Sequence, residues 1–199
     1  MARARKQDRS DTNFWIGYTD LLSNSLLILL LVVVIAALAR ASNDRPPLVR
    51  LTERESFRFS TGSYQLNPQF MSALDRRLPE VKDTIKRYRI DTIEVIGHTD
   101  GQPSPGRSNL DLLLPRATGS VVMQGYQSGS NTDLGLLRAL AVTNYLRHKL
   151  DADGFSKILI RPYSASSLIS IDGHYAPADT KERADRRRIE LRFTRQEDG

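Results

Sequence analysis

One uninterrupted apolar stretch near the beginning of the chain constrains its architecture most. From Leu26 to Ala39, fourteen apolar residues follow one another, and counting back to Phe14 extends the stretch to 26 residues. As a helix rising about 1.5 Å per residue, it would be about 39 Å long, enough to cross a bilayer with some tilt. Residues 14–39 are therefore predicted to form one transmembrane helix. Residues 1–13 would precede it and residues 40–54 would link it to a folded domain.

Asp20 is the one charged side chain inside this stretch. A carboxylate at membrane depth costs about 2.5–3.5 kcal/mol, and it is retained where it faces a bundle interior or carries protons or ions. Phe14, Trp15 and Tyr18 suit the aromatic belt at a membrane surface. These features make Asp20 a candidate functional residue, whether it pairs with another group, faces a partner helix or carries ions.

Two simpler interpretations of the segment stay open at this stage. Basic residues before the apolar run and the small-x-small sequence Ala39-Arg40-Ala41 also fit a cleaved signal peptide. Alternatively, Asp20 could lie solvated at the membrane edge without a role. Arginines flank both ends of the span, so the positive-inside rule favours a cytoplasmic N-terminus only slightly.

Composition limits the kinds of site and of binding partner that the rest of the chain can have. The absence of cysteine excludes a disulfide framework, a thiolate metal site and a lipid-modified N-terminal cysteine. A net charge of +6 suits an anionic partner. Because a membrane span precedes the folded part, a wall polymer or anionic lipid is favoured over nucleic acid.

Hydrophobic periodicity predicts an α+β domain over residues 55–199. Strands are expected at 55–59, 92–97, 157–163 and 188–194, and helices at 68–88 and 134–150, with Pro79 kinking or dividing the first helix. This order indicates a two-layer α/β sandwich with a mixed sheet. In the last strand Glu190 and Arg192 should point outward, and the arginines at 186–188 should form a solvated strand entry. Residues 101–130 form a Gly-, Pro- and Ser-rich insertion, predicted to be mobile or to contact a partner.

Three segments carry the recognisable chemistry: Ile96–Gly101 (IGHTDG) at a strand end, Asn131–Ala139 (NTDLGLLRA) at a helix start, and Arg186–Leu191 (RRRIEL) before the C-terminus. Together they resemble the OmpA-like, peptidoglycan-associating domain. The resemblance implies that Asp100 and Arg138 hold the diaminopimelate of a wall peptide, with Thr99, Asn131 and Leu134 beside them. Two departures are Arg186, where asparagine is usual, and the long insertion.

The proposed recognition is chemically sensible. A zwitterionic amino-acid head offers an ammonium to a carboxylate and a carboxylate to a guanidinium, which can bind it with two parallel hydrogen bonds. The alternative is that Asp100 and Arg138 only form a structural salt bridge. His98, without an assembled nucleophile, is weak evidence for catalysis. We therefore expect no enzyme activity, no metal and no cofactor.

The sequence FWIGYTDLL at residues 14–22, placed before such a domain, resembles the B subunit of MotB-like, ion-driven stator motors. The resemblance implies that Asp20 binds a translocated proton or sodium ion. It further implies a homodimer inside a pentameric, multi-span MotA-like ring (a 5:2 assembly), in a bacterial inner membrane with a periplasmic C-terminal domain. The short linker favours a non-flagellar relative, for instance of the Zorya anti-phage type. The runner-up is a membrane-tethered peptidoglycan clamp without ion flow, and a secreted wall hydrolase ranks last.

Overall fold

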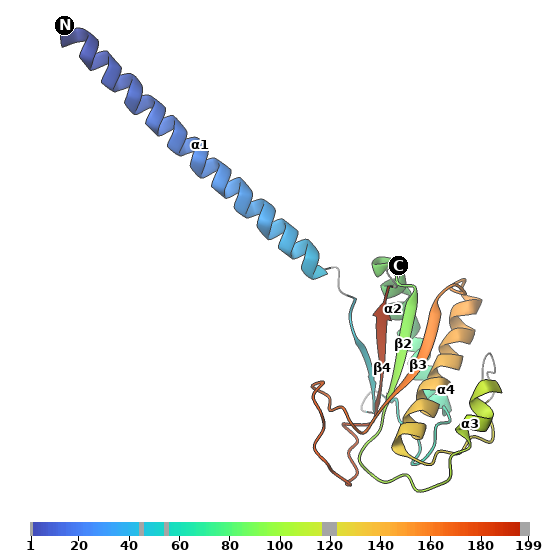
Figure 1. The fold of residues 1–199 in the computed structure, drawn as a ribbon. Helices are drawn as coiled ribbons and strands as arrows, with labels where there is room; N and C mark the ends of the chain where they lie inside the picture. The colour runs from blue at the N-terminus through green and yellow to red at the C-terminus, as the bar shows by residue number, and fades with distance from the viewer. Residues whose placement is uncertain (1, 44–45, 54–55, 117–122, 196–199) are drawn as a thin grey trace. The chain divides into compact units, whose positions relative to one another are not determined.

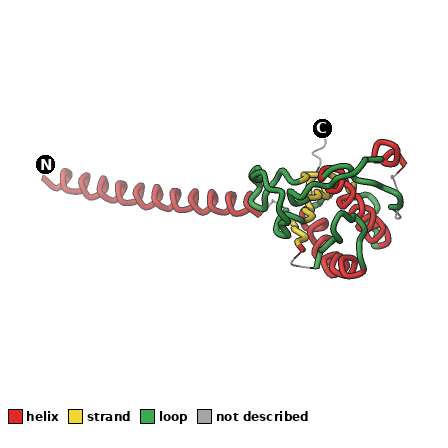
Figure 2. The backbone as a smooth tube through the Cα atoms, turned by 90° about the horizontal axis from the view of Figure 1, so that it is seen from below, coloured by secondary structure: helices red, strands yellow, loops and turns green. Residues whose placement is uncertain are grey.

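The computed structural model describes residues 2–43, 46–53, 56–116 and 123–195. The chain divides into two compact units, Met1–Arg45 and Pro46–Gly199. The first unit contains α1 (Ala2–Asn43), which runs as a single helix (Figures 1 and 2). Within it, Trp15–Arg40 has a mean hydropathy of 2.8, is not buried, and is long enough to cross a membrane. The helix predicted at residues 14–39 is thus present.

The second unit contains a four-stranded sheet among its described residues, in the order β1-β4-β2-β3. The strands are β1 (Val49–Thr52), β2 (Thr92–His98), β3 (Leu159–Ser166) and β4 (Arg188–Thr194). β2 and β3 are parallel, and α4 (Asn131–Ala152) lies between them in the sequence, whereas β4 runs antiparallel to both β1 and β2. The sheet is therefore mixed, as predicted.

Two long helices cover one face of this sheet. α2 (Pro68–Tyr88) begins at Asn67, whose side-chain oxygen accepts from the backbone N–H of Phe70, and it continues through Pro79 as one helix rather than two. Apolar residues of α2 and α4 share one core with alternate residues of the strands, such as Ile93 and Leu191. Because these strand residues point to a single face, both helices lie on that face. The result is the predicted two-layer α+β domain.

Long loops gather at the end of the sheet where β2 and β3 finish (Figure 1). One joins β2 to α4 and contains the short helix α3 (Leu110–Leu113) and the 3-10 turn η2 (Leu114–Arg116). The other joins β3 to β4. Both include long irregular stretches, drawn green in Figure 2. This end of the domain therefore offers the most varied surface.

The contact between Gly97 on β2 and Gly135 on α4 brings the two backbones unusually close. A Cβ placed on Gly97 would lie 2.0 Å from the carbonyl oxygen of Gly135, and one on Gly135 would lie 2.5 Å from Ser164 Oγ. Neither glycine has a positive φ, so the reason for glycine here is space. The contact seats the first turns of α4 against the end of β2.

The prediction of a strand at Glu55–Phe59 is wrong. The first strand is β1, which lies inside the segment assigned to the linker, while Phe57 and Phe59 lie in an irregular segment. Their rings pack against Phe70 at centroid distances of 5.2 and 4.7 Å. The alternation of apolar residues correctly indicated burial, but it does not require ladder hydrogen bonds.

Glu190 points away from the helices, as predicted, but its side chain is buried rather than exposed to solvent. It accepts from Arg188 Nε at 2.9 Å. Burial alone would raise the pKa of Glu190, but His98 and Arg188 together lower this pKa to about 2. Arg188 also donates to Ser170 O in the β3–β4 loop, at 2.9 Å. That loop therefore covers part of the second face of the sheet.

Arg186, likewise, does not belong to a solvated strand entry. Its side chain is buried, and its Nη2 donates to the carbonyl oxygen of Ser167. Nearby, a Cβ on Gly101 would collide with the carbonyl oxygen of Asp179. The β3–β4 loop is thus packed against the residues that follow β2.

We predict that Gly97→Ala lowers the stability of the second unit by about 1–3 kcal/mol, because the added methyl group overpacks the contact with Gly135. Thermal unfolding followed by near-ultraviolet circular dichroism measures it. Alanine in a strand is otherwise favoured over glycine by about 0.5–1 kcal/mol. A melting temperature equal to or above that of the wild type would therefore contradict the close contact.

Candidate functional site

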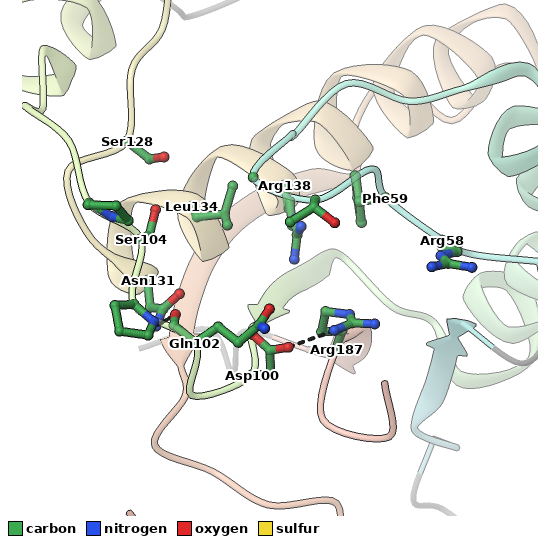
Figure 3. A pocket seen from close by; sticks show the side chains of 14 residues that line it. Arg58, Phe59, Asp100, Gln102, Ser104, Ser128, Asn131, Leu134, Arg138 and Arg187 are labelled. Carbon is green, nitrogen blue, oxygen red and sulfur yellow. Dashed lines mark hydrogen bonds and ion pairs between the residues drawn. The ribbon is translucent and has the colours of Figure 1, made fainter. Parts of the chain in front are cut away.

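A pocket of about 270 Å³ lies where β2 ends, and we call it the charged pocket. Four of the five predicted wall-binding residues line it: Asp100 from the end of β2, and Asn131, Leu134 and Arg138 from the first turns of α4 (Figure 3). Thr99 is not among the lining residues. It is buried, and its backbone N–H donates to Ser166 O at 2.9 Å.

The start of α4 is fixed by local hydrogen bonds. Ser130 caps the helix, since its hydroxyl accepts from the backbone N–H of Asp133 at 3.1 Å. The Asp133 carboxylate accepts from the N–H of Gly129 at 2.8 Å. Asn131 Nδ2 donates to Gln102 O at 2.8 Å, which connects α4 to the loop directly after Asp100. The two predicted motifs are therefore held side by side.

Arg138 places a buried cation in this pocket. Only 3% of the residue is exposed, its Nε donates to Ser63 O at 2.9 Å, and its guanidinium carbon lies 4.7 Å from the centre of the Phe59 ring. Burial and then the nearby Arg187 lower the pKa of Arg138 to about 10, which leaves it charged at neutral pH. Figure 3 shows its nitrogen atoms directed from α4 towards the side of the pocket that holds Asp100.

Asp100 pairs with Arg187 rather than with Arg138. Arg187 Nη1 lies 2.6 Å from Asp100 Oδ2, and the same oxygen accepts from the backbone N–H of Arg183 at 3.2 Å. Arg187 also donates to both carboxylate oxygens of Glu53, at 2.8 and 2.9 Å. These bonds to Glu53, despite partial burial, raise the pKa of Arg187. The structural salt bridge considered from the sequence therefore exists with a different cation.

The charge balance of the pocket favours an anionic ligand. Its described lining residues include three arginines, Arg58, Arg138 and Arg187, and one carboxylate, that of Asp100. The sequence offered a signal for Arg187, because it stands in the RRRIEL segment, but that segment was interpreted as solvated. Arg58 and Phe59 also line the pocket, and no motif pointed to them.

The insertion at residues 101–130 contributes one wall. Gln102, Ser104 and Ser128 line the charged pocket. Asn109 joins the two arms of the insertion, since its side chain donates to Gly125 O and accepts from the N–H of Gln127, each at 2.8 Å. Residues 117–122 of the insertion lie outside the described residues. Leu110 is buried, so the insertion has packing of its own.

Asp20 lies in the first unit. Asn24 Nδ2 on the next turn of α1 is 3.5 Å from Asp20 Oδ1. Trp15, Ile16, Thr19, Asp20 and Ser23 border one shallow depression on the helix surface. The hydroxyl groups of Thr19 and Ser25 each donate a hydrogen bond to the backbone carbonyl four residues earlier in α1.

We expect Arg187→Met to destabilise the second unit by about 3 kcal/mol, because it leaves the largely buried carboxylates of Asp100 and Glu53 without their shared cation. Arg183→Met removes an exposed arginine from the same loop and should cost about 1 kcal/mol or less. Chemical unfolding of both variants provides the comparison. Equal losses would show that the Arg187 network contributes no special stability.

Neither a family model nor a curated protein matches the chain. Among solved structures, it is similar to a MotB like protein from Desulfovibrio vulgaris (23% identity, TM-score 0.44, covering 75% of each chain). It is also similar to the periplasmic domain of Helicobacter pylori MotB (20%, 0.47, covering 77% of this chain and 86% of that one). A third similar structure is the cell wall anchor of the T6SS from Pseudomonas aeruginosa (19%, 0.41, covering 74% and 81%). At these identities and TM-scores the likenesses assign no function, which must come from the residues of the chain.

Proposed function

We propose that this chain is a membrane-anchored, peptidoglycan-binding B subunit of a stator-type, ion-driven motor. One observation carries the wall-binding half of the proposal: Asp100 and Arg138, which come from two separate motifs, line the same pocket. The apolar helix with its single carboxylate supports the motor half. In this proposal the protein has no enzyme activity and needs no metal or cofactor other than the translocated ion.

Arg138 would hold the anionic end of the wall peptide. Its guanidinium is buried and charged, so it binds a carboxylate more strongly than an exposed arginine would. The ammonium group of the same amino-acid head would approach Asp100, sharing that carboxylate with Arg187. Asn131 and Leu134 complete the proposed site, and Thr99 would support it from behind as a buried neighbour of Asp100. Because arginines outnumber carboxylates here, a diaminopimelate head should bind better than lysine, which lacks the second carboxylate.

Pull-down of the full-length chain, in mild detergent, with isolated diaminopimelate-type sacculi tests this site. We predict that Arg138→Gln weakens binding at least tenfold, since loss of one partner in a desolvated charged pair typically costs about 2–5 kcal/mol. Asp100→Asn should also weaken it. The charge-matched control is Arg76→Gln, an exposed arginine of α2. Wild-type protein left in the supernatant, or Arg138→Gln bound as tightly as the control, would refute the proposed site.

In the membrane, Asp20 would carry the ion. Protonation or cation binding neutralises its charge and so changes which contact with a surrounding ring is favoured, which allows ion flow to bias rotation. We propose a homodimer within a pentameric MotA-like partner, with the N-terminus cytoplasmic and the folded unit periplasmic. A plain tether is the competing function, and it has no use for a carboxylate at this depth.

The segment between the span and the sheet supports a non-flagellar role, such as anti-phage defence. Residues 41–48 alone separate Arg40, where the apolar span ends, from β1 at Val49. This is shorter than the linker expected from the sequence. Eight residues leave no room for a long amphipathic helix that could plug a channel.

Asp20→Asn should abolish ion flux while leaving expression and membrane insertion intact, because asparagine resembles the protonated acid but cannot release a proton. The measurement is ion flux, or the cellular activity of the complex, with a MotA-like partner co-expressed. Ser25→Ala serves as the control, since this hydroxyl bonds only its own helix backbone among the described contacts. A plain tether predicts instead that Asp20→Asn is neutral or stabilising. Full activity of this variant would exclude the motor and leave the wall clamp.

A further inference from the structure

A second cavity, of about 340 Å³, lies farther along α4, and we call it the tyrosine pocket. Its lining includes Tyr64, Tyr145, Gln65, Gln124 and two methionines, Met71 and Met123. No Asp, Glu, Lys or Arg is among its described lining residues. It therefore differs in chemistry from the charged pocket.

The two pockets share one face of α4. Asn131, Leu134 and Arg138 line the charged pocket, and Ala141 and Tyr145 line the tyrosine pocket. Their spacings of three, four, three and four residues place all five on one helical stripe. From Leu134 to Tyr145 this stripe is about 16 Å long. A ligand that follows α4 could therefore reach both pockets.

One irregular segment, residues 57–66, also borders both cavities. Phe59, Thr61 and Gly62 line the charged pocket, whereas Tyr64 and Gln65 line the tyrosine pocket. Between them, Ser63 O accepts from Arg138 Nε. The cavities are thus adjacent subsites on either side of one contact.

The aromatic rings of the tyrosine pocket are held in place. The Tyr145 hydroxyl donates to Asp75 Oδ1 at 2.9 Å, and Lys149 Nζ lies 3.0 Å from the same carboxylate oxygen. Tyr64 packs edge to face against Tyr126, with ring centroids 6.2 Å apart. Burial raises the pKa of both Tyr64 and Tyr145, so both hydroxyls remain neutral at physiological pH. Rings fixed in this way can contact a ligand without a further loss of rotamer freedom.

We propose that the tyrosine pocket binds a neutral, N-acetylated sugar of the wall glycan, while the charged pocket binds the peptide attached to it. This inference rests on the proposed wall-binding function and extends it. Tyrosine rings offer apolar faces to the C–H groups of a sugar, and glutamine amides both donate and accept hydrogen bonds to its hydroxyls. The methionines and Ala141 provide adaptable apolar surface for an acetamido methyl group.

The occupant is inferred from continuity and charge. The adjoining pocket is suited to the charged peptide stem, so the uncharged pocket next to it fits the part of the same polymer that carries no charge. Met123 and Gln124 belong to the 101–130 insertion, as does Tyr126, which supports Tyr64. The insertion would therefore lengthen the binding surface from one subsite to two.

The test uses the full-length chain in detergent and fluorescently labelled glycan strands whose peptides have been removed by an amidase. Wild-type protein should raise the anisotropy of these strands. Ala141→Phe, which fills the cavity, should weaken this binding at least tenfold. The matched control is Ala152→Phe, at the exposed end of the same helix. Since Ala141→Phe could perturb folding, Gln124→Ala, at an exposed position, provides a second variant with an expected several-fold loss.

The effects of the variants on the two ligands distinguish the two subsites. Arg138→Gln should weaken binding to intact sacculi far more than binding to peptide-free strands. Failure of wild-type protein to bind peptide-free strands would overturn the sugar subsite, as would folded Ala141→Phe and Gln124→Ala variants that bind them normally. Those outcomes leave the charged pocket untouched. Conversely, unaltered sacculus binding by Arg138→Gln would refute the peptide site alone.

Discussion

The backbone contact between Gly97 and Gly135 determines how the functional end of this domain is built. It lets α4 approach β2 more closely than any side chain would permit. Asp100 follows Gly97 at the end of the strand, and Arg138 follows Gly135 by one helical turn. The separation of these two charged residues, and hence the dimensions of the charged pocket, depends on that close approach. Substituting either glycine would affect the pocket through packing before it affected any ligand contact.

Charge compensation then decides what the pocket can bind. Arg187, just before β4, forms ion pairs with Asp100, just after β2, and with Glu53, just after β1. The three residues form one network. Desolvated charges are stable only when paired with good geometry, and this network supplies that pairing. Arg138 is different, because the hydrogen bond and ring contact described for it involve a carbonyl and an aromatic face, not a carboxylate. A ligand carboxylate would give Arg138 a direct anionic partner in addition to the nearby charges of Glu53 and Asp100.

The proposed anchoring to a wall polymer would explain why two binding pockets lie side by side. A single small pocket on a surface can release its ligand readily, whereas two adjacent subsites on one chain raise the effective concentration of each part of the ligand for the other. An anchor that resists force benefits from this arrangement. The proposed ion-carrying residue in α1 would generate that force, and the short segment before β1 would transmit it with little slack.

Features that depend on local pattern could be predicted from the residues alone. The bounds of α2 and β4 follow from their periods of 3.6 and two residues, and the apolar span with Asp20 follows from hydropathy alone. The motifs place Asp100 at a strand end and Arg138 near a helix start, and in the structure both residues line one pocket. Three features became evident only in the folded structure: the pairing of Asp100 with Arg187, the burial of Glu190 and the location of the first strand. These depend on residues far apart in the sequence, such as Glu53 and Arg187, and on the competition between packing and ladder hydrogen bonds at Phe57 and Phe59. The local sequence pattern cannot predict which of the two prevails, because the result depends on neighbouring residues that folding brings together.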